Sequence, residues 1–204
     1  MKPNSIYIGD ALDLIDKLDL SPKLIIFSPP ELSETNMTLV GYKRFLDTIY
    51  RKCYDKLDSG ILCSISTDRK IGGHIYLKHV DIINAVGKEP NLYKIWCKSL
   101  KANLFILNFA HILIWKKNKR INPILPDVFV SPTDKIKGYK TKDTFSSEVV
   151  KILIESFTKK NQLVVDPFIG TGKVAKICLE TGRKFIGFEL KRNNIKLCKE
   201  FIRK

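Results

Sequence analysis

The chain is poor in the residues on which secreted, metal-binding and membrane proteins depend. Its 204 residues include two Met, two Trp, three His and five Cys. The cysteines show no C-x-x-C spacing and the histidines form no recognisable ligand set, so neither a disulfide framework nor a metal site is predicted. No apolar run approaches the ~18 residues that cross a bilayer, and no secretion signal opens the chain. We therefore expect a soluble, intracellular protein with buried free thiols and no membrane partner.

Acidic residues are also scarce. The chain carries 36 Lys and Arg against 21 Asp and Glu, which gives a net charge of +15. Such an excess favours a polyanionic partner, because neutralising phosphates releases condensed counterions. Charge that serves solubility alone is the alternative. The composition, 44% hydrophobic and 28% charged, is globular, and the length suits one domain over residues 1–204.

Strand-like apolar runs alternate with amphipathic segments along most of the chain. Strands are predicted at residues 6–8, 24–27, 60–65, 92–97, 108–115, 162–165 and 184–188. Helices are predicted at residues 12–18, 42–57, 74–86, 146–157, 174–181 and 191–203, with a loop at 68–73. This order predicts an α/β fold with a doubly wound, Rossmann-like sheet of about seven strands and a ligand at their carboxyl ends.

Residues 116–143 break the alternation. The segment opens with a basic run, contains several prolines and shows little periodicity. We expect a loop or a short insertion rather than another sheet element. The basic run is a candidate for contact with nucleic-acid phosphates, and a solvated loop is the alternative. The residues of this run are Lys116, Lys117, Lys119 and Arg120.

The most informative stretch, residues 164–173, reads V-V-D-P-F-I-G-T-G-K. An apolar strand ends at Asp166 and passes through two glycines into a helix. Gly170 and Gly172 allow positive φ and a close ligand approach, while the helix start presents free N–H groups. The next strand ends at Glu189, whose carboxylate can accept hydrogen bonds from ribose hydroxyls. The inferred ligand is a nucleoside.

Other motifs compete for this turn. The dinucleotide fingerprint places its first glycine directly after the strand, but three residues separate Asp166 from Gly170. A P-loop requires glycine where Pro167 stands and Ser or Thr where Val174 stands. What remains is a turn with little provision for phosphate, suited to an uncharged or cationic nucleoside. An ordinary strand-to-helix turn without a ligand is the structural alternative.

A second motif, Ser28-Pro29-Pro30, follows the buried strand 24–27. Proline restricts both its own φ and the preceding residue, so this sequence is a stiff elbow at the edge where α/β sheets build their sites. The exocyclic amines of cytosine and adenine are weak nucleophiles. Acceptors placed on their N–H bonds stabilise the charge that develops during methylation. The Ser28 hydroxyl and the Pro29 carbonyl suit that role, although such a turn is also common without any catalytic use.

Taken in chain order, Gly9-Asp10, Ser28-Pro29-Pro30, the D-P-F-x-G-x-G of residues 166–172 and Glu189 resemble the β-class amino-group DNA methyltransferases, whose catalytic motif precedes the cofactor motif. The resemblance spans nearly the whole chain. It implies a circularly permuted sheet, S-adenosyl-L-methionine (SAM) as cofactor, DNA as a substrate whose base is flipped, and a role in restriction–modification. It implies that the SAM pocket consists of Asp10, Asp166, Pro167, Phe168, Gly170, Gly172 and Glu189, and that the catalytic elbow consists of Ser28, Pro29 and Pro30.

Family members with Ser at the first catalytic position mostly methylate N4 of cytosine, whereas Asp or Asn there more often indicates N6 of adenine. Ser28 therefore favours cytosine. The family places an aromatic residue after Pro-Pro to stack on the flipped base, but this chain has Glu31 there, and Tyr42 is a candidate to supply the ring. Glu31 and Tyr42 are therefore candidate nucleic-acid contacts, and a solvated loop acid is the alternative for Glu31. A catalytically silent nucleic-acid-binding subunit and an RNA base methyltransferase are the alternatives. Because only residues 116–143 are available for target recognition, we expect a short recognition sequence, or specificity supplied by a partner or a second copy.

Overall fold

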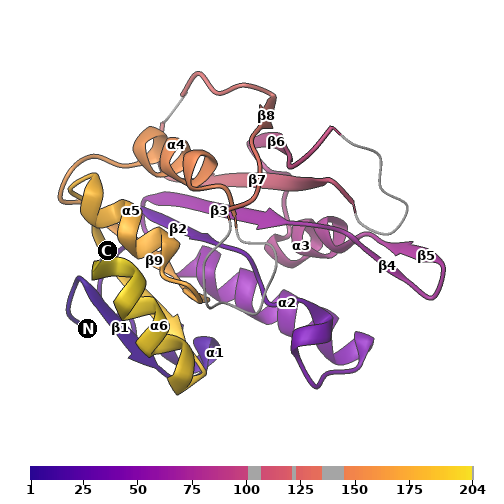
Figure 1. Ribbon diagram of the computed structural model, residues 1–204, viewed down its shortest axis with the longest axis horizontal. Helices are drawn as coiled ribbons and strands as arrows, with labels where there is room; N and C mark the ends of the chain where they lie inside the picture. Colours follow the sequence, from indigo (N-terminus) through magenta and orange to yellow (C-terminus); the bar gives the residue numbers. More distant parts are fainter. Residues whose placement is uncertain (101–106, 121–122, 135–144, 204) are drawn as a thin grey trace.

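One large sheet runs through the protein (Figure 1). The computed structural model describes residues 1–100, 107–120, 123–134 and 145–203. Within these ranges, eight strands of the sheet lie in the order β1-β10-β9-β2-β3-β7-β6-β8. Their bounds are β1 Ser5–Ile8, β2 Leu24–Phe27, β3 Gly60–Ser66, β6 Leu92–Cys97, β7 Phe109–Lys117, β8 Val128–Val130, β9 Leu163–Asp166 and β10 Lys184–Glu189. Among these described strands only β7 runs antiparallel, so the carboxyl ends of the others share one edge.

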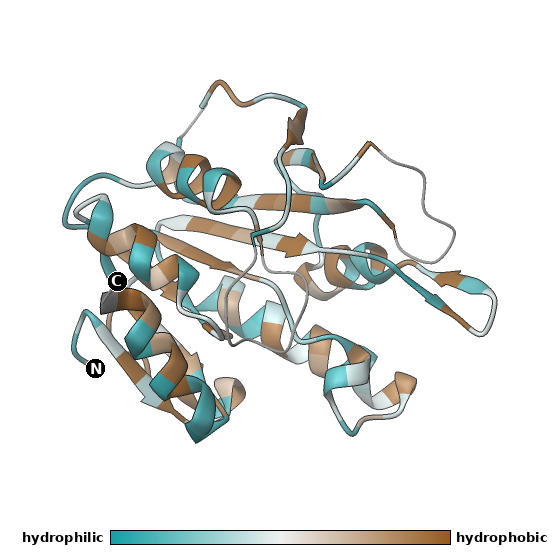
Figure 2. Cartoon of the chain, in the orientation of Figure 1, coloured by the Kyte–Doolittle hydropathy of each residue, from teal (hydrophilic) through white to brown (hydrophobic). Residues whose placement is uncertain are grey.

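Helices cover both faces of the sheet (Figure 1). One group consists of α4 (Ser147–Phe157), α5 (Lys173–Glu180) and α6 (Arg192–Arg203), and the other of α1 (Ala11–Asp16), α2 (Leu39–Asp55) and α3 (Lys78–Val86). In β2, Leu24 and Ile26 pack with the first group, whereas Ile25 and Phe27 pack with the second. Successive strand side chains point to opposite faces, so a continuous apolar run needs cover on both. Figure 2 accordingly shows β2 and β7 coloured largely as hydrophobic. None of the described helices is both long and apolar enough to cross a lipid bilayer.

The predicted α/β sheet is confirmed, but a hairpin replaces a predicted loop and the start of a predicted helix. Residues 68–76 contain β4 (Arg69–Ile71) and β5 (His74–Tyr76), which pair antiparallel, and the helix begins only at Lys78. Gly72 and Gly73 both have positive φ, 55° and 81°. A two-residue hairpin turn of this kind requires positive φ at both positions, and glycine adopts it without steric cost.

Residues 116–143 also contribute a strand, contrary to the prediction. Val128–Val130 forms β8 and pairs in parallel with β6, with Phe129 opposite Trp96. Phe129 is buried while both flanking valines are exposed. Three alternating residues between two prolines are too short a pattern to distinguish from a loop. Residues 121–122 and 135–143 of the predicted insertion lie outside the described residues.

The strands from the two ends of the chain are interleaved. β1 pairs with β10, where Ser5 lies opposite Ile186, and β9 pairs with β2, where Ile25 lies opposite Val165. Strands β10 and β9 therefore lie between β1 and β2. This is the permuted order that the resemblance implies. As a result, the Ser-Pro-Pro elbow and the glycine turn leave neighbouring parallel strands at the same edge.

Candidate active site

Four neighbouring parallel strands end in polar residues at one edge of the sheet. Asp10 follows β1, Glu189 ends β10, Asp166 ends β9 and Ser28 follows β2. Adjacent strands lie ~4.8 Å apart, so this row extends over about 15 Å. That length accommodates an extended ligand of nucleoside size. The structure thus brings together residues that the sequence predicted as one site although up to 179 positions separate them.

The glycine turn is held to both β9 and β10. The backbone N–H of Phe168 donates to Asp166 Oδ1, on β9, at 2.9 Å, and the backbone N–H of Ile169 donates to Phe188 O, on β10, at 3.0 Å. Ile169 packs against Gly187, where an added Cβ would lie only 2.1 Å from Ile169 Cδ1. Sequence reasoning assigned no role to Gly187, yet a side chain there would displace the turn. This contact explains why a glycine interrupts an otherwise apolar strand.

Gly172 has a packing role that the sequence did not indicate. Its φ of 84° lies in the left-handed region, as expected for a residue of this turn. An added Cβ, however, would lie 2.4 Å from Cys198 Sγ and 3.2 Å from Ile202, both on α6. The missing side chain therefore admits α6 against the turn. This packing alone accounts for a glycine at position 172. That the missing side chain also leaves room for a ligand stays a prediction.

Asp166 is the electrostatic centre of the row. It is 6% exposed. Burial raises the pKa of its carboxyl to about 7, the hydrogen bond from Phe168 N opposes the rise, and the charge of Glu189 adds to it. A cationic group placed beside Asp166 would favour the ionised form.

The two neighbouring carboxylates are oriented by local hydrogen bonds. Glu189 Oε1 accepts from Lys191 N at 2.8 Å and from Asn194 Nδ2 at 3.2 Å. Asp10 is the N-cap of α1, and its Oδ1 accepts from Leu12 N at 2.8 Å. Both carboxylates are thus held at the start of a helix that follows their strand.

A hydrogen bond from the α2 helix holds the Ser-Pro-Pro elbow in place. The hydroxyl of Tyr42 donates to Pro30 O at 2.7 Å, and the Tyr42 side chain is fully buried. Ser28 Oγ donates to Pro29 O over 3.4 Å, a long hydrogen bond that leaves the hydroxyl available to another partner. The rings of Phe27 and Phe168 lie 5.5 Å apart and join the elbow to the glycine turn. The prediction that the two motifs come together is confirmed.

Glu31, directly after the elbow, is neutralised by two cations. Its Oε1 accepts from Lys78 Nζ and its Oε2 from Arg69 Nε, each at 2.8 Å. Burial raises the pKa of Glu31, but the bonds from Arg69 and Lys78 outweigh it and the pKa is lowered. Burial also lowers the pKa of Lys78, which is 1% exposed. The elbow is therefore tied to β4 and α3 by a buried ion pair.

These contacts correct two of the predicted nucleic-acid contacts. The ring of Tyr42 has no exposed surface to offer a base, since its relative exposure is 0%. The carboxylate of Glu31 is occupied by its two ion pairs. Sequence reasoning missed Arg69 and Lys78, because residues 38 and 47 positions away leave no local spacing signal.

The predicted basic run lies at the opposite edge of the sheet. Lys117 is paired with Gly60, the first residue of β3, and a seven-residue strand separates the two edges by roughly 20 Å. Lys117 Nζ donates to the carbonyls of Tyr54 and Asp55 at 3.1 Å, at the end of α2. Lys119 Nζ donates to the carbonyl of Phe157 at 2.8 Å, at the end of α4. These two lysines offset the negative carboxyl-terminal ends of two helices. A structural role therefore accounts for their position without any contact with phosphates.

Comparisons with known proteins agree with this arrangement. Residues 87–200, more than half of the chain, match the family model N6_N4_Mtase, described as DNA methylase. The type II methyltransferase M.HinfI of Haemophilus influenzae is 25% identical over 114 residues. That match covers 53% of this chain and 32% of M.HinfI, so the chain spans about a third of that curated relative.

Solved structures match over nearly the whole chain. The PvuII DNA methyltransferase, which is cytosine-N4-specific, has a TM-score of 0.82 at 17% identity, with 98% of this chain and 88% of that chain covered. A Thermus thermophilus protein described as a DNA modification methylase, in complex with S-adenosyl-L-methionine, has a TM-score of 0.73 at 22% identity. That match covers 97% of this chain and 93% of the other. These likenesses show the fold.

Proposed function

Because this chain belongs to the DNA methylase family of N6/N4 amino-group methyltransferases, we propose that it transfers a methyl group from SAM to an exocyclic base amine in DNA, with N4 of cytosine preferred over N6 of adenine. The observation that carries this proposal is the row formed by Asp10, Glu189, Asp166 and Ser28 on adjacent strand ends. Three carboxylates and one hydroxyl lie there in the order that a nucleoside cofactor and a base substrate need.

The charge of the row suits SAM in particular. SAM carries a permanent positive charge on sulfur and a second on its amino group. Asp166 is buried and its pKa is raised to about 7. A cation of SAM placed beside it would stabilise the ionised carboxylate, which has no such partner among the described residues of the free site. Glu189 would accept the ribose hydroxyls and Asp10 would lie near the adenine. Phe168, half-buried between the two motifs, would pack against the cofactor.

The elbow supplies the acceptors for methyl transfer. Bound SAM would supply the methyl group: the amine nitrogen would bond to the methyl carbon as the carbon–sulfur bond breaks with its electron pair kept by sulfur, and the positive charge on the nitrogen would be lost with a proton released to water. Ser28 Oγ and the Pro29 carbonyl can accept the two N–H bonds of the amine. The Tyr42–Pro30 hydrogen bond and the Glu31 ion pairs hold the elbow in place before substrate arrives. Acceptors prepared in this way need no rearrangement as charge develops.

The preference for cytosine rests on Ser28. Serine at this position is typical of N4-cytosine enzymes, and the structural relative PvuII methyltransferase is cytosine-N4-specific. Digestion of methylated DNA to nucleosides, followed by mass spectrometry, tests the proposal. N4-methylcytosine as the main product supports it. N6-methyladenine alone would reverse the preference between the bases, and methylation of RNA alone would move the substrate to the other nucleic acid.

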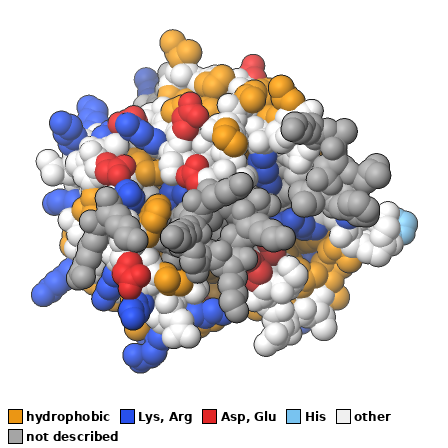
Figure 3. All heavy atoms as spheres, in the orientation of Figure 1, with side chains coloured by type: hydrophobic (Ala, Val, Ile, Leu, Met, Phe, Trp, Pro, Cys, Tyr) orange, Lys and Arg blue, Asp and Glu red, His pale blue; other side chains and the backbone are white. Residues whose placement is uncertain are grey.

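DNA reaches the site over a positive surface. Lys and Arg side chains are spread over the face in Figure 3, most densely on the side of α5 and α6. At the site edge itself, Arg69 and Lys70 lie on the β4–β5 hairpin, directly after β3. Basic residues near the row attract phosphates and speed association without specifying sequence. We infer that this hairpin, rather than residues 116–120, contacts the DNA backbone.

Glu31 favours one second candidate, a nucleic-acid-binding subunit that is catalytically silent. With a carboxylate after the elbow and Tyr42 buried, a flipped base lacks the family's stacking partner, a contact worth about 1–3 kcal/mol. Methyl transfer from labelled SAM separates the candidates. DNA and SAM binding without incorporation into any single or double strand would support the silent subunit. In either case we propose one domain over residues 1–204, with target choice assisted by a partner or a second copy.

A further inference from the structure

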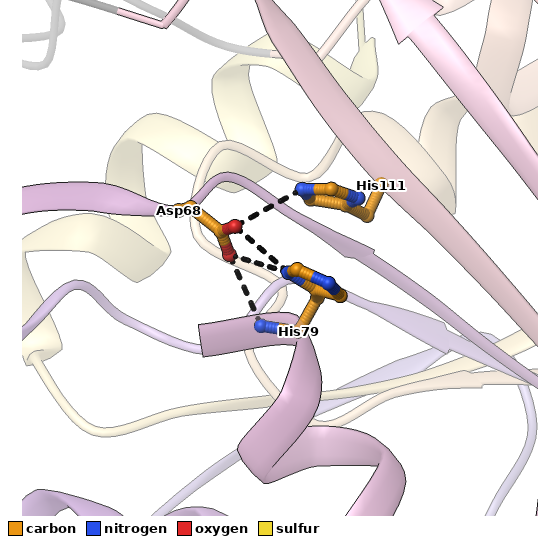
Figure 4. A group of neighbouring side chains, drawn as sticks. All are labelled: Asp68, His79 and His111. Atoms are coloured by element: carbon orange, nitrogen blue, oxygen red, sulfur yellow. Dashed lines mark hydrogen bonds and ion pairs between the residues drawn. The ribbon is translucent and has the colours of Figure 1, made fainter. Parts of the chain in front are cut away.

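Three residues from separate elements converge beside the elbow (Figure 4). Asp68 follows β3, His79 lies in the first turn of α3, and His111 lies on β7. Each offers one ligand atom, and all of these atoms lie within 4.8 Å of one another. The two imidazole rings stack with centroids 3.9 Å apart, and both turn a nitrogen toward the carboxylate. Among the described residues this is the group that can offer three metal ligands.

One nitrogen of this cluster is buried without a hydrogen-bond partner. His111 is 5% exposed, and its Nε2 makes no hydrogen bond, although it lies 3.3 Å from Asp68 Oδ2. Asp68 is itself 4% exposed. An ion placed between His111 Nε2 and the Asp68 carboxylate would give this buried nitrogen the partner that it lacks.

We propose that Asp68, His79 and His111 bind a divalent transition-metal ion of the Zn²⁺ class. Two imidazole nitrogens and one carboxylate form a ligand set that suits these ions, and water completes the fourth position. Ligand atoms on tetrahedral Zn²⁺ lie roughly 3.3 Å apart, because each metal bond is about 2.0–2.1 Å long. The His111 Nε2 to Asp68 Oδ2 separation is already 3.3 Å. His79 Nδ1 is now 2.8 Å from Asp68 Oδ2, and the three ligand atoms lie within 4.8 Å of one another, so small shifts of the His79 side chain would bring the set to this spacing.

Neighbouring groups already orient these ligands. The hydroxyl of Tyr93 hydrogen-bonds His111 Nδ1 at 2.6 Å, which directs the other ring nitrogen at the carboxylate. The backbone N–H of His79 donates to Asp68 Oδ1 at 3.1 Å, while Asp68 Oδ2 faces both His79 Nδ1, at 2.8 Å, and His111 Nε2, at 3.3 Å. The side chain of His79 is 20% exposed, so ion and water have a route from solvent. A role for Asp68 in capping α3 explains Oδ1 alone and leaves His111 unexplained.

A bound ion would stiffen the catalytic elbow. Asp68 and His79 are adjacent in sequence to Arg69 and Lys78, the two residues that hold Glu31. An ion that joins the end of β3 to α3 and β7 fixes the backbone from which both cations reach the elbow. The proposal about metal binding does not depend on methyl transfer, since it is read from the protein and the ion alone.

The test uses the tag-free protein stripped with a chelator. Calorimetric titration with Zn²⁺ should give one site, and Co²⁺ should develop visible absorption from nitrogen and oxygen coordination. His79→Gln and His111→Gln should each lower Zn²⁺ affinity at least 10–100-fold, roughly the loss seen when even a supporting residue of a metal site is removed. His74→Gln is the matched control, because His74 lies exposed on the nearby β5 strand outside the cluster. It should leave affinity unchanged.

Circular dichroism and metal-free melting of each variant guard against a loss of folding. Bound Zn²⁺ should raise the Tm of the wild type and of His74→Gln but not of His79→Gln. Absence of any binding isotherm would overturn the proposal and leave a hydrogen-bonded clamp in its place. Equal losses in His74→Gln and His79→Gln would also overturn it, because the binding would then be nonspecific.

Discussion

Replacing Asp166 by Asn should stabilise the free protein while it weakens SAM binding. The amide retains the shape of the carboxyl group and its acceptor for Phe168 N. Burial raises the pKa of Asp166 from 3.8 to about 7, so the folded protein holds this proton more tightly than the unfolded chain does. The free energy of unfolding of the wild type therefore falls as the pH rises from about 4 to about 7. Asn carries no such proton and escapes this loss.

The pKa fixes the expected magnitude. At ~1.4 kcal/mol for each pH unit, a rise from 3.8 to about 7 corresponds to a destabilisation of about 4 kcal/mol above pH 7. Urea unfolding of both proteins from about pH 4 to pH 8 measures it. The curves should nearly coincide at the acid end and separate progressively, with the variant more stable. Asp58→Asn is the control, because Asp58 lies exposed before β3 at the opposite edge.

A gap between wild type and Asp166→Asn that stays constant over this pH range would refute the electrostatic reasoning. Calorimetry at pH 8 addresses the ligand separately. Loss of the ionised carboxylate should weaken SAM binding by roughly 10–100-fold, as expected for a hydrogen-bonded charge worth about 1.5–3 kcal/mol. Wild-type affinity in the variant would remove Asp166 from the cofactor pocket even if its pKa proves correct.

The elbow, its ion pair and the basic residues of the two sheet edges each support a separate prediction. Ser28→Ala should lower kcat roughly 10²-fold with SAM affinity retained, because its acceptor is used as charge develops on the amine. Ser33→Ala, at an exposed serine in the short 3-10 helix Leu32–Glu34, is the control and should have wild-type kinetics. An unchanged kcat in Ser28→Ala would contradict the mechanism. Glu31→Gln should lower the free energy of unfolding in urea by about 3–5 kcal/mol, because Lys78 is left buried without its anion. The double variant with Lys78→Met should recover most of that loss. An equally unstable double variant would show that the ion pair is not the cause. Lys119→Ala should lower the free energy of unfolding by about 0.3–1 kcal/mol without affecting DNA affinity. Lys70→Ala should weaken DNA binding and reduce its salt dependence. The reverse outcome would show that DNA binds at the edge of the sheet where residues 116–120 lie.

Local patterns in the sequence were sufficient for most of the sheet. Continuous apolar runs such as 24–27 and 184–188 mark strands buried on both faces, and both agree with β2 and β10 to within a residue. The β4–β5 hairpin escaped because a Gly-Gly pair reads equally well as a loop. β8 escaped because three residues carry too little periodicity, and its position depends on pairing with β6.

The site divides along the same line. Ser-Pro-Pro and D-P-F-x-G-x-G are contiguous motifs, each at the carboxyl end of a strand. In a parallel α/β sheet the carboxyl ends of the strands lie at one edge, so the two motifs are expected there. By contrast, Lys78 reaches Glu31 across 47 positions and His111 meets Asp68 from another strand. No spacing rule connects such residues, because their proximity is created by the fold itself. The position of the basic run at residues 116–120 could not be predicted for a related reason, since charge alone does not say which edge of the sheet a segment occupies.

The interleaving of β9 and β10 between β1 and β2 bears on how the chain assembles during synthesis. β1 and one edge of β2 leave the ribosome long before their partners β10 and β9 exist, whereas the other edge of β2 pairs with β3, which follows soon after it. Closure of the sheet must then wait for contacts of high sequence separation, which slows folding and exposes sticky edges in the nascent chain. Early polypeptides released before that point should therefore depend on chaperones, whereas the finished chain should not.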